Sequence, residues 1–66
     1  SVPDRLVCYQ GRVLFLEIKA PGKRPTPKQD FTHRKMEKHG LLVRWVDNVM
    51  EGFDIIEMFV KNQLIP

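Results

Sequence analysis

The chain has 66 residues and a mass of 7.8 kDa, which leaves room for one domain and excludes a second. Apolar residues make up 42% of it and charged residues 29%, as in ordinary globular domains, and no apolar run approaches the ~20 residues of a membrane span. Its single cysteine, Cys8, excludes an internal disulfide and a cysteine-rich zinc site. Because so short a chain buries only about 60% of its unfolded surface, we expect it to depend on a partner subunit or on further sequence.

Positive charge is concentrated in the middle of the chain. The formal net charge is +3, and residues 20–40 include six basic residues and only two acidic ones. A basic stretch of this kind suits a polyanion such as nucleic acid, and it equally suits a solvated helix face. Charge alone leaves both explanations open.

A β-hairpin is predicted first. Residues 4–9 have strand character, Gln10-Gly11 is a turn signal, and residues 13–19 (VLFLEIK) form a second strand. The second strand is apolar on both faces over its first half, so we expect it to be central and buried. Cys8, in the middle of the first strand, is expected to be a small buried apolar side chain.

A helix is predicted next, after a loop that Pro21, Gly22 and Pro25 keep irregular. Thr26 and Gln29 form a capping-box pattern, with a proline at the first helical position. The helix should extend to about residue 39, where a glycine follows.

A third strand and a second helix complete the predicted order. Residues 41–46 (LLVRWV) form the strand, and a strand–helix–strand sequence implies a right-handed crossover with the two strands parallel. The second helix covers roughly residues 50–62, with Asn48 as its cap and an apolar stripe that includes Phe53 and Phe59. The predicted fold class is therefore α/β: a mixed sheet made of a β-hairpin, a crossover helix, a strand and a C-terminal helix.

The hairpin turn also predicts where two carboxylates lie. A two- or four-residue loop at Gln10-Gly11 pairs Tyr9 with Arg12 and, further out, Asp4 with Glu17. Opposed side chains have Cβ atoms about 4.5–5.5 Å apart, so the two acids repel each other unless a divalent cation lies between them. An odd-length loop would place Asp4 on the other face.

Lys19 lies two residues beyond Glu17 and so on the same face of the strand. Its ammonium could orient a water molecule and stabilise developing negative charge. Taken singly, Asp4 could be a turn residue, and Glu17 and Lys19 could be a strand end in solvent. The three together favour a functional site.

These residues resemble a known family. Pro3-Asp4, followed by Glu17-Ile18-Lys19 after an apolar strand, resembles the PD-(D/E)xK nuclease signature. The longer strings VPDRLV at 2–7, FLEIKAPGK at 15–23 and PxQ at 27–29 are similar to the VRR-NUC branch, the virus-type replication-repair nucleases common in phages. The resemblance covers Val2 to about Val46 and implies a restriction-endonuclease-like fold.

The resemblance implies a role for each matching residue. Asp4 and Glu17 would bind Mg²⁺ or Mn²⁺, together with the backbone carbonyl of Ile18. Lys19 would orient or activate the attacking water, and Gln29 would support the active site as well as cap the helix. The implied activity is a metal-dependent endo- or exodeoxyribonuclease that hydrolyses DNA phosphodiester bonds, with a preference for branched or junction-like DNA.

The resemblance further implies a homodimer, because this branch is similar to Holliday-junction resolvases. Family members carry a helix before the PD strand, so we expect residues 1–66 to be a single VRR-NUC-type domain without that N-terminal helix. The expected partner is DNA, with neither a membrane nor a small-molecule cofactor, in the cytoplasm of a bacterial or phage-infected cell. Alternatives are a non-catalytic nucleic-acid-binding or assembly module with the same fold, and a small dimerisation domain.

The remaining polar residues divide into two groups. Lys23, Arg24 and Lys28 follow Lys19 and are expected to contact DNA phosphates. The later helix residues Arg34, Lys35 and Lys38 are expected to form a solvated face, and His33 and His39, six residues apart, do not have the spacing of a helical metal pair. Trp45 is expected in the core or a subunit interface.

Overall fold

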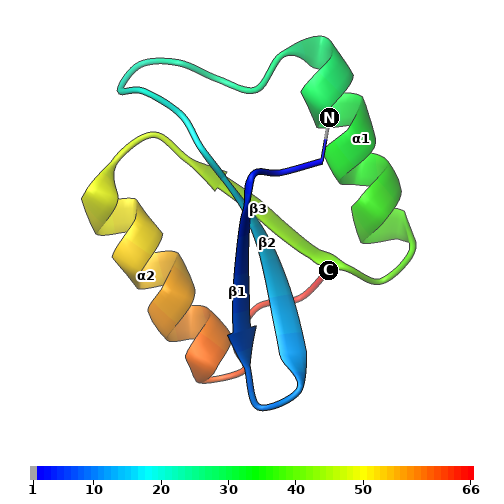
Figure 1. The fold of residues 1–66 in the computed structure, drawn as a ribbon, viewed down its shortest axis with the longest axis vertical. Coiled ribbons are helices and arrows are strands. Elements are labelled where there is room, and N and C mark those ends of the chain that lie inside the picture. Colours follow the sequence, from blue (N-terminus) through cyan, green and yellow to red (C-terminus); the bar gives the residue numbers. More distant parts are fainter. Residues whose placement is uncertain (1) are drawn as a thin grey trace.

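The computed structural model describes residues 2–66 as one three-stranded sheet with two helices. The elements in chain order are β1 (Arg5–Tyr9), β2 (Arg12–Ile18), α1 (Pro27–Lys38), β3 (Leu42–Val46) and α2 (Val49–Val60). The strand order is β1-β2-β3, with β1 antiparallel and β3 parallel to the central β2. The two helices lie on opposite sides of the sheet (Figure 1). The predicted α/β class is confirmed, and the arrangement is consistent with a restriction-endonuclease-like fold.

The hairpin register is the one that the turn predicts. Gln10 and Gly11 both have positive φ, 49° and 75°, which is the two-residue turn whose twist matches that of the flanking strands. Tyr9 pairs with Arg12, and the ladder continues outward as far as Arg5 and Leu16. The central position predicted for β2 is also confirmed.

Helix α1 begins with the predicted capping box. The Thr26 hydroxyl accepts a hydrogen bond from the Gln29 N–H at 3.1 Å, and Oε1 of Gln29 accepts one from the Thr26 N–H at 2.9 Å. The helix ends at Lys38, one residue earlier than predicted, and Gly40 follows with a φ of 87°. This capping fixes the position of Gln29 relative to the sheet.

The main core lies between the sheet and α2. Leu14 and Phe59 are completely buried there, with Leu64 beside them. The guanidinium of Arg12 donates hydrogen bonds to the carbonyls of Phe59 and Val60, at 2.6 and 3.2 Å. These carbonyls belong to the last turn of α2, whose end attracts a cation, and the Phe59 carbonyl also accepts a hydrogen bond from the Asn62 N–H at 3.0 Å.

The expected burial of Cys8 is wrong, and one member of the predicted apolar stripe of α2 lies in solvent. Cys8 is exposed, because α1 packs against β3 and does not extend over β1, which is at the sheet edge. The same face of the hairpin exposes Leu6 by 62% and Val13 by 40%. Phe53 is 68% exposed, because the core side of α2 is formed by Phe59 and Ile55. Within residues 2–66, no helix has the length and apolar character needed to cross a membrane.

Candidate active site

Glu17, Lys19 and Gln29 meet where β2 ends beside the first turn of α1. The Lys19 Nζ atom lies 3.6 Å from a carboxylate oxygen of Glu17 and donates a hydrogen bond of 2.7 Å to Oε1 of Gln29. The shared face predicted for Glu17 and Lys19 is therefore confirmed. The Lys19 main chain is held as well, because its N–H donates to the Val46 carbonyl at 2.8 Å.

One oxygen of Gln29 serves two partners. Oε1 accepts from the Lys19 ammonium and from the Thr26 backbone N–H, and only an oxygen can accept from both. This contact fixes the orientation of the amide, so the Nε2 group is the free end. Within residues 2–66, Nε2 makes no hydrogen bond, which leaves two N–H donors available at the site. The two explanations of Gln29, helix capping and active-site support, are thus compatible.

Glu17 is a buried acid at the centre of the sheet. The residue is only 7% exposed, and Lys19 is its ion-pair partner, with a side chain 18% exposed. Burial of a carboxylate costs free energy that a single ammonium at 3.6 Å only partly offsets. Replacement of a buried ion pair by apolar residues is often neutral or stabilising, so stability gives no reason for an acid at this position. A buried acid whose charge is only partly balanced is a common feature of functional sites.

The carbonyl of Ile18 lies free at the same place. The Lys19 N–H points to β3, and backbone groups alternate along a strand, so the Ile18 carbonyl points toward the β1 side. The ladder with β1 ends two residues earlier, at Leu16 and Arg5. Within the described chain, the Ile18 oxygen therefore has no hydrogen-bond donor and keeps its lone pairs available.

Asp4 lies just outside β1, in a bend. Its carboxylate is 3.5 Å from the Arg5 guanidinium, and both side chains are at least half exposed. The confirmed register would place Asp4 opposite Glu17 if the ladder extended one step further, but the strand begins at Arg5. The opposition of the two acids therefore stays a prediction from the register.

The oxygen donors at this site fit a small hard cation. Within residues 2–66, no three His, Cys, Asp or Glu side chains come together as a metal-binding group. Mg²⁺ is commonly held by one or two carboxylates, with waters and substrate phosphates completing its shell. Glu17 and the Ile18 carbonyl are donors of that kind, and Asp4 would join them only if the pairing of β1 with β2 extended one residue further.

The loop after Lys19 is held in a defined shape beside these residues. Residues 20–23 form a turn closed by a 2.9 Å hydrogen bond from the Lys23 N–H to the Ala20 carbonyl, with Gly22 at a φ of 82°. The Gly22 N–H donates to the Asp47 carboxylate at 3.1 Å. This hydrogen bond, followed by one from Asn48, lowers the pKa of Asp47 below its ordinary 3.8.

The three predicted phosphate-contacting residues are all exposed around this loop. Lys23 closes the turn, and Lys28 lies in the first turn of α1 beside Gln29. Arg24 stacks over the ring of Trp45, with its Cζ atom 5.8 Å from the ring centre. Trp45 is partly exposed and so is not a core residue. It pairs with Glu17 across the β2–β3 ladder, which places it beside the candidate site.

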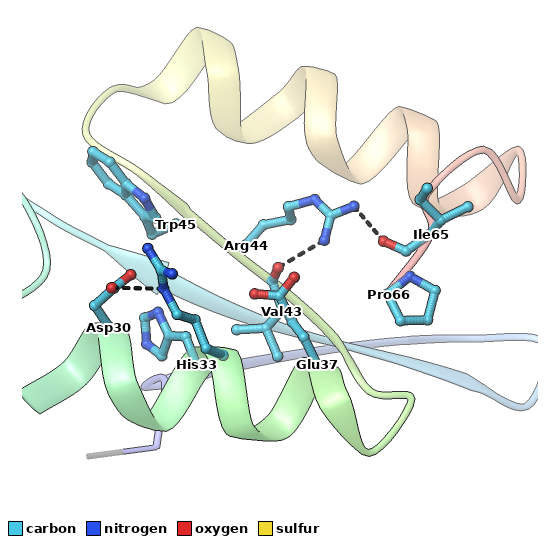
Figure 2. Close-up of a pocket in the computed structure, with 9 residues that line it drawn as sticks. Asp30, His33, Glu37, Val43, Arg44, Trp45, Ile65 and Pro66 are labelled. Carbon is cyan, nitrogen blue, oxygen red and sulfur yellow. Dashed lines mark hydrogen bonds and ion pairs between the residues drawn. The ribbon is translucent and has the colours of Figure 1, made fainter.

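A separate hollow of about 570 Å³ lies between α1, β3 and the C-terminal residues (Figure 2). Arg44 spans it, donating to the carbonyls of Val43 at 2.8 Å and Ile65 at 2.6 Å. His33 lines it and is 4% exposed, with a buried Nε2 atom that has no partner within residues 2–66. None of Asp4, Glu17 and Lys19 lines this hollow, so it is distinct from the candidate site.

Among the contacts that the sequence did not predict, three join distant parts of the chain. They are the Arg12 contact with the end of α2, the Asp47 contact with the loop, and the stacking of Arg24 on Trp45. Each joins residues that are at least 21 positions apart, so no local pattern of residues could have indicated it.

Comparison with known proteins finds a phage protein that resembles part of this chain. The chain is 50% identical over 37 residues to a protein named "Putative nuclease p44" from Acyrthosiphon pisum secondary endosymbiont phage 1. The match covers 54% of this chain and 40% of the relative's length, so it spans less than half of that protein. No family model matches the chain, and no solved structure matches it significantly.

Proposed function

We propose that this chain is a metal-dependent DNA nuclease of the VRR-NUC type, with its active site at Glu17, Lys19 and Gln29. The observation that carries the proposal is the buried Glu17 carboxylate beside a lysine that is itself anchored by Gln29. The name of the phage relative supports nuclease activity. The chain is basic, and its site combines an acid with a lysine. These charges suit a polyanionic substrate better than a neutral one.

Each residue has a defined part in this proposal. Glu17, the Ile18 carbonyl and Asp4 would hold Mg²⁺ or Mn²⁺, and a bound ion would draw charge from the phosphate and lower the pKa of water. The Lys19 ammonium, fixed by its 2.7 Å hydrogen bond to Gln29, donates to the attacking water or to a phosphate oxygen. The free Nε2 group of Gln29 supplies a further donor beside it.

The exposed basic residues place the DNA backbone over this site. Lys23, Arg24 and Lys28 surround it and contact phosphates without reading the base sequence. The Asp47 hydrogen bond to Gly22 holds the first two in place. Binding should therefore weaken steeply as salt concentration rises.

The same proposal includes a second copy of the chain as partner and the cytoplasm of a bacterial or phage-infected cell as its location. The exposed apolar face of the hairpin, with Leu6, Cys8 and Val13, supports the dimer, because a chain this small leaves that face of the sheet uncovered. Sedimentation of the wild-type chain and of Leu6→Glu checks it. A monomer at all concentrations would contradict the dimer.

Cleavage of flapped, branched and duplex DNA with Mg²⁺ or Mn²⁺ tests the activity. Glu17→Gln, Asp4→Asn and Lys19→Met are each expected to reduce cleavage at least 100-fold. Asp54→Asn removes an exposed acid from α2 and serves as the matched control, with unchanged cleavage. A Glu17→Gln or Asp4→Asn chain that cuts as well as the wild type would contradict the assignment.

A non-catalytic nucleic-acid-binding module remains the competing proposal, supported by the exposed basic loop. Calorimetry with Mn²⁺ separates the two. The nuclease binds Mn²⁺ and loses that binding in Glu17→Gln, whereas a binding module retains DNA affinity and gives no heat with the metal. The second result would replace the nuclease proposal.

A further inference from the structure

The outward face of α1 carries positive charge with one aromatic ring among it. Beyond Pro27, the exposed residues of the helix and of its C-terminal cap are spaced three or four apart and so face the same way: Lys28, Phe31, Arg34, Lys35, Lys38 and His39. Both acids of α1, Asp30 and Glu37, are half-buried and lie to its sides, and Asp30 pairs with Arg34 at 2.9 Å. We refer to the six exposed residues as the basic face of α1.

Phe31 is unusual within this face. It is 69% exposed, and with Arg34, Lys35, Lys38 and His39 it lines an open hollow of about 670 Å³. An exposed phenylalanine by itself requires no explanation. Phe53 on α2 is equally exposed, at 68%, but its helix has acidic residues and no basic one in its first three turns. The distinguishing feature of Phe31 is therefore its basic surroundings.

The chemistry of the basic face selects one kind of occupant. Cations at regular spacing fit a row of phosphates, and a free aromatic ring among them fits the flat face of an unpaired base. A paired duplex hides those base faces in its stack and presents only phosphates. A membrane surface would need a larger apolar area than a single phenylalanine.

The position of the basic face also connects it with the candidate active site. Lys28, at its beginning, is the neighbour of Gln29, whose side chain holds Lys19. From Lys28 to Lys38 the helix extends about 15 Å. A strand leaving the active site along α1 would therefore meet Phe31 after the first turn and the later lysines beyond it.

We propose that the basic face of α1 binds single-stranded DNA, with Phe31 stacking on an unpaired base and Lys35 and Lys38 contacting the flanking phosphates. The inference rests on the proposed function and deepens it: the face holds the unpaired arm of a flapped or branched substrate while the paired part lies at the active site. Preference for branched DNA then arises from α1.

Binding of labelled oligo(dT) and of a blunt duplex, measured by fluorescence anisotropy with the full chain in EDTA, tests the proposal. Phe31→Ala and Phe31→Leu are expected to weaken oligo(dT) binding about 5- to 150-fold and duplex binding less than twofold. Phe31→Trp is expected to retain oligo(dT) binding, because it keeps a stacking ring. Lys38→Ala should lower the salt dependence on the single strand by a log–log slope of about 0.7.

Phe53→Ala is the matched control, with the same side chain at the same exposure on an acidic helix. It should leave both affinities unchanged. Equal losses in Phe31→Ala and Phe53→Ala, or full binding by Phe31→Leu, would overturn the stacking. Sedimentation could instead show that Phe31→Ala loses self-association and keeps DNA binding. That result would overturn the proposal and assign the basic face of α1 to contact with a second copy of the chain.

Because the binding measurements are made in EDTA, without metal, their outcome is independent of the cleavage assay that tests the nuclease proposal. If the chain does not cleave DNA but binds oligo(dT) through Phe31, the nuclease proposal fails and the single-strand site stands. If it cleaves flapped DNA and Phe31→Ala binds oligo(dT) as the wild type does, the site on α1 is overturned and the nuclease stands.

Discussion

Lys19 and Gln29 are joined by a hydrogen bond of 2.7 Å between the end of the central strand and the first turn of α1. The oxygen that accepts it also accepts the Thr26 N–H, so the capping of a helix and the position of the candidate catalytic lysine depend on one atom. Stability and activity are therefore coupled at Gln29, and suitable substitutions separate them.

Replacement of Gln29 tests this coupling. Gln29→Ala removes the reciprocal capping bond and should cost about 1 kcal/mol of unfolding free energy, together with most of the cleavage activity. Gln29→Glu can still cap the helix and pair with Lys19, but it removes the Nε2 donor, so it should keep stability and lose activity. Urea unfolding and cleavage assays measure the two effects.

Thr26→Ala is the control for these variants, because it removes the cap without changing the Lys19 partner. It should destabilise the chain by about 1 kcal/mol and leave cleavage per folded molecule unchanged. Full activity in Gln29→Glu would show that Gln29 acts only as a cap and a lysine anchor.

Substitutions of Glu17 and Lys19 should have unequal effects on stability. Glu17→Gln removes the buried carboxylate and keeps the shape of the side chain, and it leaves a lysine that is more exposed and still bonded to Gln29. It should therefore lower the melting temperature less than Lys19→Met does, despite the lost activity. Lys19→Met leaves that carboxylate buried without its cation and should cost about 1–3 kcal/mol. A lower melting temperature for Glu17→Gln than for Lys19→Met would contradict the view that Glu17 is retained at the expense of stability.

Arg12 is expected to stabilise the fold without contributing to the chemistry. Arg12→Met leaves the Val60 carbonyl without its donor, while the Phe59 carbonyl keeps the Asn62 N–H, and it should lower the unfolding free energy by about 1–3 kcal/mol. Lys61→Met, which only breaks an exposed pair with Glu57 at 3.9 Å, should change it by less than about 0.5 kcal/mol. Similar denaturant midpoints for the two variants would show that the Arg12 contacts are energetically neutral.

The lowered pKa of Asp47 predicts a specific acid dependence. Because the hydrogen bond from Gly22 stabilises the ionised carboxylate in the folded chain, its contribution to stability is complete above the ordinary pKa of 3.8 and is lost as pH falls through the lower folded value. Asp47→Asn lacks this contribution, so its urea midpoint should approach that of the wild type on acidification below that range.

The control for Asp47 is Asp54→Asn, which changes the net charge equally but lies on α2, away from the loop. The difference in urea midpoint between Asp54→Asn and the wild type should not show the same dependence on pH. If the difference in urea midpoint between Asp47→Asn and the wild type stays constant as the pH falls below 3.8, the contact with Gly22 does not depend on the charge of Asp47.

The sequence by itself determined the parts that depend on neighbouring residues. The Gln10-Gly11 turn fixed the hairpin register, Thr26 and Gln29 fixed the start of α1, and the strand–helix–strand order required the parallel pair. These features follow from backbone conformation and capping over a few positions, where side-chain type decides the outcome. The shared face of Glu17 and Lys19 was predictable for the same reason, since a strand alternates strictly.

Only the tertiary structure decided which atoms meet across the chain and which apolar side chains remain exposed. The Lys19–Gln29 bond, the burial of Glu17, and the contrast between exposed Phe31 and buried Phe59 depend on where each helix packs on the sheet. That placement results from the summed packing of the whole core, in which Phe53 and Phe59 have the same chemistry but different neighbours. Residue type therefore indicated the chemistry of the site, and packing decided its geometry and the face that it leaves open to a partner.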